Sequence, residues 1–190
     1  AWRGVELLGR IGAPQGISVI AERVKDPDER VRHAAIDALG RFQAKGVVEP
    51  LRKAMGHLSP TTRARAGRAL AQRGSGGIAM PLFAAFETEK DPEASQELLE
   101  TLVGLDSPEI GAALARVALE RRGFLGFGTG DLRRQLAIVE ALAARNTPVA
   151  QQTLVRIVAE ARGEVQEAAQ AALARMTKDP PPPGGLTARS

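Results

Sequence analysis

The sequence predicts an all-α protein: a right-handed α-solenoid, or αα-superhelix, in which two-helix repeats stack side by side. The first observation is a leucine that recurs at steps of 31, 31, 32, 40 and 31 residues, at Leu8, Leu39, Leu70, Leu102, Leu142 and Leu173. The second is a series that follows each of the first five leucines by 12 residues, at Ile20, Leu51, Leu82, Leu114 and Leu154. A fixed period with a fixed offset is typical of a repeat array, in which helix pairs bury their apolar faces against neighbouring pairs.

The stretch from Asp26 to Phe42 defines one helix of the repeat most clearly. We expect Asp26 to cap this helix and Pro27 to occupy its first position, with acidic residues in the first turn. Apolar residues then recur at helical spacing, at Val31, Ala34, Ala35, Ala38, Leu39 and Phe42. Because most of this stripe is alanine, a second helix should approach it closely. We expect the alanines to lie where the second helix of a repeat (B) meets the first (A), at Ala34, Ala35, Ala38 and Ala69.

In chain order, the pattern predicts a lone B helix at 1–12 and five repeats near 13–43, 44–74, 75–105, 106–145 and 146–176. After the first full repeat, A helices are expected near Val47–Leu58, Ile78–Lys90, Pro108–Arg122 and Pro148–Ala161. Their B helices are expected near Pro60–Arg73, Pro92–Leu105, Asp131–Arg145 and Glu164–Met176. Glycine and proline mark the turns between them, and residues 177–190 form a Pro/Gly-rich tail or linker.

The first helix has no A partner in this pattern. We therefore expect its apolar face, formed by Val5, Leu8 and Ile11, to lack one neighbour. Because the chain opens inside a helical pattern, we also expect it to be a fragment of a longer protein.

Composition narrows the function classes. The 190 residues contain no cysteine, which rules out disulfides and thiolate metal sites, and the two histidines, His33 and His57, make a histidine metal centre unlikely to form. The net charge of +4 permits nucleic-acid binding without requiring it. No apolar run reaches membrane-spanning length and no signal peptide is visible, so we expect a cytoplasmic protein. We expect no enzyme activity, cofactor, metal or small-molecule substrate, because no catalytic constellation is evident.

The repeat resembles a known family. The run Asp26-Pro27, Val31-Arg32, Ala34-Ala35 and Ala38-Leu39-Gly40 is similar to HEAT repeats, in particular the short bacterial type called phycobilisome lyase HEAT-like repeats. The last repeat, with Val165, Ala168, Ala169, Ala172 and Leu173, is a fair match, and the repeats between are looser. The resemblance covers nearly the whole chain to Met176 and implies the fold much more than the function.

One segment breaks the period. Repeat four is about nine residues longer than the others, and the inserted residues 123–130 are rich in glycine. Insertions in repeat arrays commonly fall on a binding face. We therefore treat the loop and its flanks as a candidate protein-binding site, formed by Phe124, Leu125, Phe127, Arg121, Arg122 and Arg133. The alternative is that the two phenylalanines fold back and cover the ends of neighbouring helices.

The second candidate is the face lined by B helices, which is concave in HEAT-type arrays. The position of Asp37 points away from the apolar stripe, and its equivalents are Arg68, Glu100, Glu140 and Ala171. This row has mixed charge, whereas a nucleic-acid duplex requires a track of cations. The resemblance to HEAT-like repeats also implies a structural role for Arg32, in which it bonds the turn acid of a neighbouring repeat. Its equivalents are Arg63, Ser95, Gln135 and Gln166, so we expect this ladder to be interrupted.

These features favour a non-catalytic scaffold for protein–protein interaction that uses the B-helix face, the repeat-four loop, or both. The partner would be another protein or another domain of the same polypeptide. One alternative is a nucleic-acid-binding HEAT module with a fold like that of certain DNA glycosylases. Another is a phycobilin lyase-type subunit, suggested by the name of the repeat family.

Overall fold

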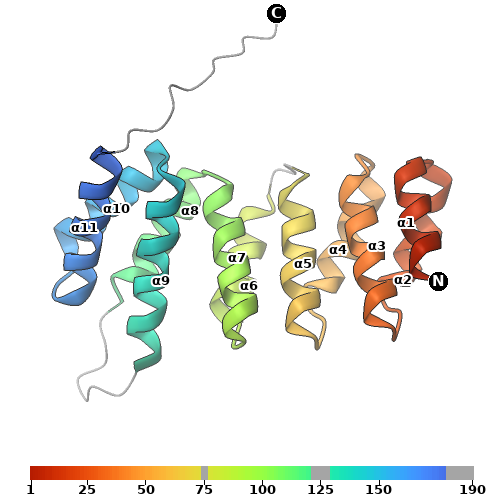
Figure 1. Cartoon of the computed structure of the whole chain (residues 1–190), viewed down its shortest axis with the longest axis horizontal. Coiled ribbons are helices and arrows are strands. Elements are labelled where there is room, and N and C mark those ends of the chain that lie inside the picture. Colours follow the sequence, from red (N-terminus) through yellow and green to blue (C-terminus); the bar gives the residue numbers. More distant parts are fainter. Residues whose placement is uncertain (74–76, 121–128, 179–190) are drawn as a thin grey trace, which may run out of the picture. The chain divides into compact units, whose positions relative to one another are not determined.

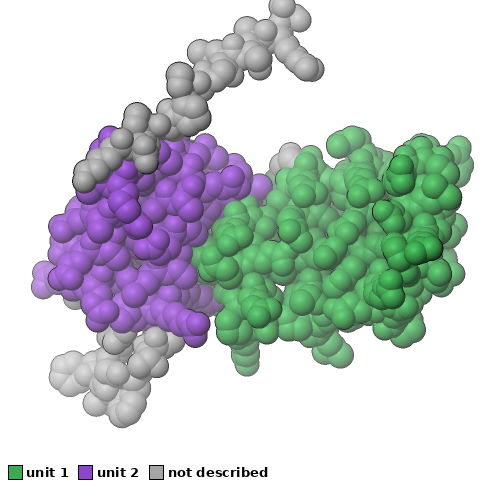
Figure 2. Space-filling model, viewed as in Figure 1, with its two compact units in different colours: residues 1–102 green, residues 103–190 purple. Residues whose placement is uncertain are grey.

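The computed structural model describes residues 1–73, 77–120 and 129–178, and every regular element within these ranges is a helix (Figure 1). The chain forms two compact units, Ala1–Leu102 and Val103–Ser190, which are described separately (Figure 2). In each unit, helices pair and the pairs stack on one another. The all-α class and the stacking of two-helix repeats are therefore confirmed.

The first unit contains the lone B helix and three repeats. Helix α1 spans Trp2–Ile11. The A helices are α2 (Ile17–Arg23), α4 (Val48–Ala54) and α6 (Ala79–Thr88), and short 3-10 helices at Pro14–Gly16 and Lys45–Val47 precede the first two. The B helices are α3 (Glu29–Arg41), α5 (Pro60–Ala71) and α7 (Pro92–Gly104), the last of which ends in the second unit.

The second unit contains two further repeats. Their A helices are α8 (Pro108–Ala118) and α10 (Pro148–Glu160), and their B helices are α9 (Thr129–Arg145) and α11 (Glu164–Lys178). The helices thus lie where the two leucine series place them, with ends that differ by a few residues. That residues 1–176 form one array followed by a tail stays a prediction.

The start of α3 differs from the prediction. Asp28 caps the helix, because its carboxylate accepts the backbone N–H of Arg30 at 2.9 Å. Asp26 lies in the turn, where its carboxylate accepts the backbone N–H of Asp28 at 3.0 Å. The assignment of the cap to Asp26 was wrong by two residues, because its side chain closes the turn before the helix and leaves Pro27 outside it.

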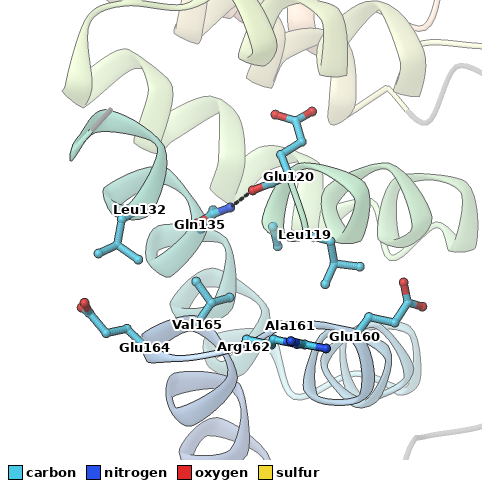
Figure 3. A pocket seen from close by; sticks show the side chains of 10 residues that line it. Leu119, Glu120, Leu132, Gln135, Glu160, Ala161, Arg162, Glu164 and Val165 are labelled. Carbon is cyan, nitrogen blue, oxygen red and sulfur yellow. Dashed lines mark hydrogen bonds between the residues drawn. The ribbon is translucent and has the colours of Figure 1, made fainter. Parts of the chain in front are cut away.

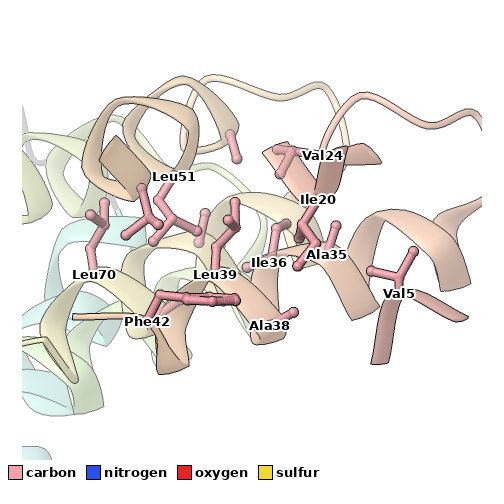
Figure 4. Close-up of a cluster of buried hydrophobic side chains, with 14 of the residues drawn as sticks. Val5, Ile20, Val24, Ala35, Ile36, Ala38, Leu39, Phe42, Leu51 and Leu70 are labelled. Atoms are coloured by element: carbon pink, nitrogen blue, oxygen red, sulfur yellow. The ribbon is translucent and has the colours of Figure 1, made fainter. Parts of the chain in front are cut away.

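The core of the first unit follows the predicted stripe. Figure 4 shows buried side chains of α2, α3, α4 and α5 meeting between the helices, among them Ile20, Leu39, Leu51 and Leu70, each with no exposed surface. On α1, Val5 is buried, whereas Leu8 is 36% and Ile11 is 64% exposed. Most of the apolar face of α1 therefore lacks a neighbour, as expected.

Two of the predicted alanines, Ala38 and Ala69, pack against the preceding B helix. A Cβ atom added to Gly9 of α1 would lie 2.5 Å from Cβ of Ala38, and one added to Gly40 of α3 would lie 3.1 Å from Cβ of Ala69. Ala38 and Ala69 therefore lie where successive B helices meet. Their small side chains leave room for the glycine backbone of the preceding B helix.

Candidate protein-binding surfaces

Arg32 holds the turn that precedes its own helix. Its Nη1 donates to the carbonyl oxygens of Asp26 at 2.8 Å and Pro27 at 3.4 Å, and its Nε donates to Oγ1 of Thr62 on α5 at 3.0 Å. The prediction that Arg32 bonds the turn acid of a neighbouring repeat is therefore wrong. The guanidinium closes its own turn through main-chain carbonyls and contacts the next B helix through a hydroxyl.

Arg63 occupies the equivalent position on α5 and makes the fuller set of bonds. Its Nη1 donates to the carbonyl oxygens of His57 and Leu58, both at 2.8 Å. Its Nε and Nη2 donate to the two carboxylate oxygens of Glu89, at 2.7 and 2.6 Å. Glu89 follows α6, and its side chain is 2% exposed. The expected bond to the turn acid of the neighbouring repeat is present here, and this hydrogen bond holds the pKa of Glu89 below its usual value.

Gln135 and Gln166 occupy this position in the last two repeats, and each keeps the bond to a main-chain carbonyl of its own repeat. The side-chain amide of Gln135 donates to the carbonyl oxygen of Glu120 at 2.8 Å, and that of Gln166 donates to Val158 at 3.0 Å. Each bond ties a B helix to the end of its own A helix. At Gln135 and Gln166 the bond within the repeat is therefore kept, and the side-chain amide that makes it points to its own turn and not to the next repeat.

The turn held by Arg63 presents an exposed leucine. Leu58 is 94% exposed, the highest value among the large apolar side chains that the structure describes. Its carbonyl is bonded by Arg63, and the backbone N–H of Ser59 donates to Nδ1 of His57 at 3.0 Å. A fully exposed apolar side chain thus projects from a backbone fixed on both sides.

A groove lies next to this turn, between α2 and α4. Its volume is about 360 Å³, and apolar atoms come from Ala21, Val24, Pro50 and Ala54. His57 lines the same groove and directly precedes Leu58. We call the groove together with Leu58 the Leu58 surface. It combines a hollow that admits aliphatic side chains with a projecting leucine.

Charged groups surround the groove, and several are already compensated. Arg52 donates to both carboxylate oxygens of Glu49, at 2.9 and 3.0 Å, and Nζ of Lys53 lies 3.7 Å from the same carboxylate. Burial lowers the pKa of His57, as do the charges of Arg32 and Arg63. A neutral His57 suits the observed bond, because its Nδ1 must be unprotonated to accept the hydrogen bond from the backbone N–H of Ser59.

The predicted row on the B-helix face is exposed, at Asp37, Arg68, Glu100, Glu140 and Ala171. Its charges pair diagonally with the neighbouring helix. Arg65 reaches Asp37 at 2.6 Å, Arg68 reaches Glu97 at 2.6 Å, and Arg175 reaches Glu140 at 3.3 Å. The sequence pattern relates only equivalent positions of the repeats. It therefore does not reveal these ion pairs, which join positions one turn apart on successive helices.

The repeat-four candidate falls largely outside the described residues, which holds for Phe124, Leu125, Phe127, Arg121 and Arg122. Arg133 is described and is exposed on α9. Beside the ends of the described segments, a cavity of about 470 Å³ lies among the ends of α8, α9, α10 and α11 (Figure 3). Leu119, Leu132 and Val165 supply apolar lining, and the amide of Gln135 points to the carbonyl oxygen of Glu120. The binding role of the loop stays a prediction.

In the described part of the chain, no three His, Cys, Asp or Glu side chains gather in a way that could hold a metal ion. The same ring nitrogen of His33, Nε2, lies 3.2 Å from the Thr62 hydroxyl and 3.5 Å from the Glu29 carboxylate. A catalytic triad uses the two ring nitrogens for these two contacts and needs an accessible hydroxyl, whereas Thr62 has no exposed surface. None of the described helices combines the length and apolar character needed to cross a bilayer.

Comparison with known proteins gives a sequence match at the beginning of the chain. Residues 1–57 match the family model for HEAT repeats, which agrees with the resemblance seen in the sequence. No curated protein matches the chain. Among solved structures, human deoxyhypusine hydroxylase in complex with glycerol is similar, with a TM-score of 0.48 and 21% identity, covering 94% of this chain and 68% of that one. The segment up to residue 57 is thus similar in sequence to HEAT repeats, and the later repeats share its helical period.

Proposed function

We propose that this chain is a non-catalytic scaffold that binds another protein, or another domain of the same polypeptide, through the Leu58 surface. The observation that carries the proposal is the 94% exposure of Leu58 on a turn fixed by hydrogen bonds. Burying a leucine side chain contributes about 1.5–3 kcal/mol. A rigid turn loses little conformational entropy on binding, so more of this contribution remains as affinity.

The groove explains why the partner would be a protein. A peptide or helix can insert aliphatic side chains between α2 and α4 while its other residues contact Leu58. The exposed B-helix row stays a predicted contact face. Nucleic-acid binding and a phycobilin lyase role remain the alternatives, and the cytoplasmic location and bacterial origin stay predictions.

The test compares two single substitutions at exposed apolar side chains. Leu58→Asp places a charge at the centre of the proposed contact, and Val155→Asp places one on α10, where Val155 is 57% exposed. Proteins cross-linked to the tagged full chain in its own cells are identified for the parent and both variants. We expect the specific set to be lost from Leu58→Asp and kept by Val155→Asp, with unchanged thermal unfolding in both. Equal capture by the parent and both variants would overturn the proposal.

A further inference from the structure

A stripe of exposed positions runs along each B helix of the first unit. Its positions are four, three and four residues apart, so they share one helix face. On α3 they are Arg30, Ala34, Asp37 and Arg41; on α5 they are Thr61, Arg65, Arg68 and Gln72; on α7 they are Glu93, Glu97 and Glu100. We call these residues the B-stripe. Each of them is exposed or half-buried.

Charge is segregated along the first unit. Residues 1–73 carry 14 Lys and Arg against 7 Asp and Glu, whereas residues 77–102 carry one against six. The B-stripe follows the same trend, with a surplus of arginine on α3 and α5 and only acids among the charges on α7. One surface therefore has a basic side and an acidic side.

The charges in the middle of the B-stripe are compensated within the chain. Arg65 pairs with Asp37, and Arg68 pairs with Glu97. Among the described residues, the outer charges of the B-stripe have no ion pair. Arg30 stacks on the ring of Trp2, with 5.0 Å from its Cζ to the ring centroid, and Glu100 accepts a hydrogen bond from Gln96. Arg30 and Arg41 on α3, and Glu93 and Glu100 on α7, are thus available to charges outside the chain.

We propose that two copies of this chain associate through the B-stripe, about a two-fold axis that runs along α5. Rotation about such an axis keeps the helix direction and exchanges the two sides, so α3 of each copy faces α7 of the other. Arg30 then lies opposite Glu93 of the second copy, and Arg41 lies near its Glu100. A two-fold contact uses the same surface on both copies, which a surface of two opposite charges satisfies twice. The inference is independent of the Leu58 surface.

The expected contact is weak. A helix of 12 or 13 residues is about 20 Å long, and packed helices lie about 10 Å apart, so three helix faces cover about 600 Å² of each copy. Two copies would bury about 1,200 Å², the lower limit for a specific stable interface. Because the B-stripe is charged, ionic strength should control the association.

Nucleic acid is the less favoured occupant of the arginines. A phosphate backbone requires cations along one track, and Asp37 lies between Arg30 and Arg41 on the same stripe. The acidic side on α7 would repel the phosphates that continue past α5. A second copy satisfies both sides of the surface.

The experiment uses two charge-reversed forms of the full chain, Arg30→Glu with Arg41→Glu and Glu93→Arg with Glu100→Arg. Sedimentation velocity at about 50 mM and about 500 mM NaCl measures association under weak and strong screening. We expect the parent to dimerise at low salt and dissociate at high salt. Each reversed form alone should remain monomeric, because both of its sides then carry the same sign. Their equimolar mixture should dimerise again, because the opposite signs face each other at both contacts.

A control reverses the same amount of charge away from the B-stripe, with Lys25→Glu in the turn after α2 and Arg52→Glu on α4, and should leave dimerisation intact. Circular dichroism checks that every form is folded. A parent that stays monomeric at low salt, or a mixture that stays monomeric, would overturn the inference. So would a parent that is monomeric alone and binds a DNA or RNA oligonucleotide through Arg30 and Arg41.

Discussion

The two units connect their repeats in different ways. In the first unit, the B helices approach closely through Gly9 with Ala38 and through Gly40 with Ala69. In the second unit, the close approach lies between A helices, where a Cβ atom on Gly111 of α8 would lie 2.5 Å from Oγ1 of Thr153 on α10. The polar bonds differ in parallel, since arginines reach the next repeat in the first unit and glutamines hold only their own turn in the second.

The repeat position of Arg63 and Gln135 therefore has two separate structural roles. Closing the turn between A and B needs a side chain with a single N–H donor aimed at a carbonyl oxygen, and Gln135 provides it. Joining successive repeats needs further donors in another direction, which the planar guanidinium of Arg63 supplies. The same helix pair can therefore be coupled strongly or weakly to its neighbour without any change in its own hairpin.

We expect the largest loss of stability when Arg63 of the first unit is replaced by glutamine, the residue that the second unit has at this position. Arg63→Gln can still bond its own turn, but it removes the cation beside Glu89, whose side chain is 2% exposed. Removing one partner of a buried ion pair costs about 3–5 kcal/mol. We therefore expect about 3 kcal/mol less free energy of unfolding in urea.

The matched substitution in the second unit is Gln135→Ala. It removes one hydrogen bond to a main-chain carbonyl, and we expect a loss of about 1 kcal/mol. If Arg63→Gln is no more destabilising than Gln135→Ala, the bond between repeats contributes nothing, and the distinction between the two units fails.

The second effect tests the close contact of B helices. Ala38→Leu would place three further carbon atoms against the backbone of Gly9, and we expect a loss of about 1–3 kcal/mol from overpacking. Ala171→Leu on α11 is the control, because Ala171 is exposed on a B helix. Thermal unfolding of the Ala38 variant that matches the parent would show that α1 and α3 are farther apart than described.

The sequence was sufficient for the helices and insufficient for the contacts between them. The two leucine series located both helices of each repeat, because stacked repeats of nearly constant length bury equivalent positions of each helix. It could not show which helix faces Ala38, because an alanine stripe fits either neighbour. The exposed position of Asp37 was predictable, whereas its pairing with Arg65 depends on the offset between helices. Leu58 had no periodic signal, since it lies in a turn.

A smaller effect on stability tests the close approach of the A helices, because we expect opposite signs for two Gly→Ala variants. Gly→Ala inside a helix normally stabilises by about 0.5–1 kcal/mol. Gly4→Ala on α1 meets open space, so we expect a gain of that size. Gly111→Ala would crowd the buried Thr153, and we expect a net loss of about 1 kcal/mol. Gains in both variants, measured by urea unfolding, would show that α10 yields to the added methyl group.

The smallest effect concerns pH and the contact between α3 and α5. Burial lowers the pKa of His33, the charges of Arg65 and Arg32 lower it further, and Glu29 and Asp37 act in the opposite direction. The folded chain therefore binds fewer protons at this position than the unfolded chain does. This contribution to stability is fully present above the usual histidine pKa of 6.5 and is lost as pH falls below it. We expect the urea midpoint to fall modestly between about pH 7.5 and pH 5.

The pKa of His57 is also lowered, so substitutions are used to distinguish the contributions of the two histidines to the pH dependence. His33→Gln should reduce the pH dependence in part, and the double variant with His57→Gln should remove most of it. The pKa of Glu89 is lowered from 4.5, so its contribution is lost at lower pH than this window. A parent whose stability rises as pH falls from 7.5 to 5 would show that Glu29 and Asp37 outweigh burial at His33. The α3–α5 contact would then favour the charged imidazole, opposite to the arrangement described.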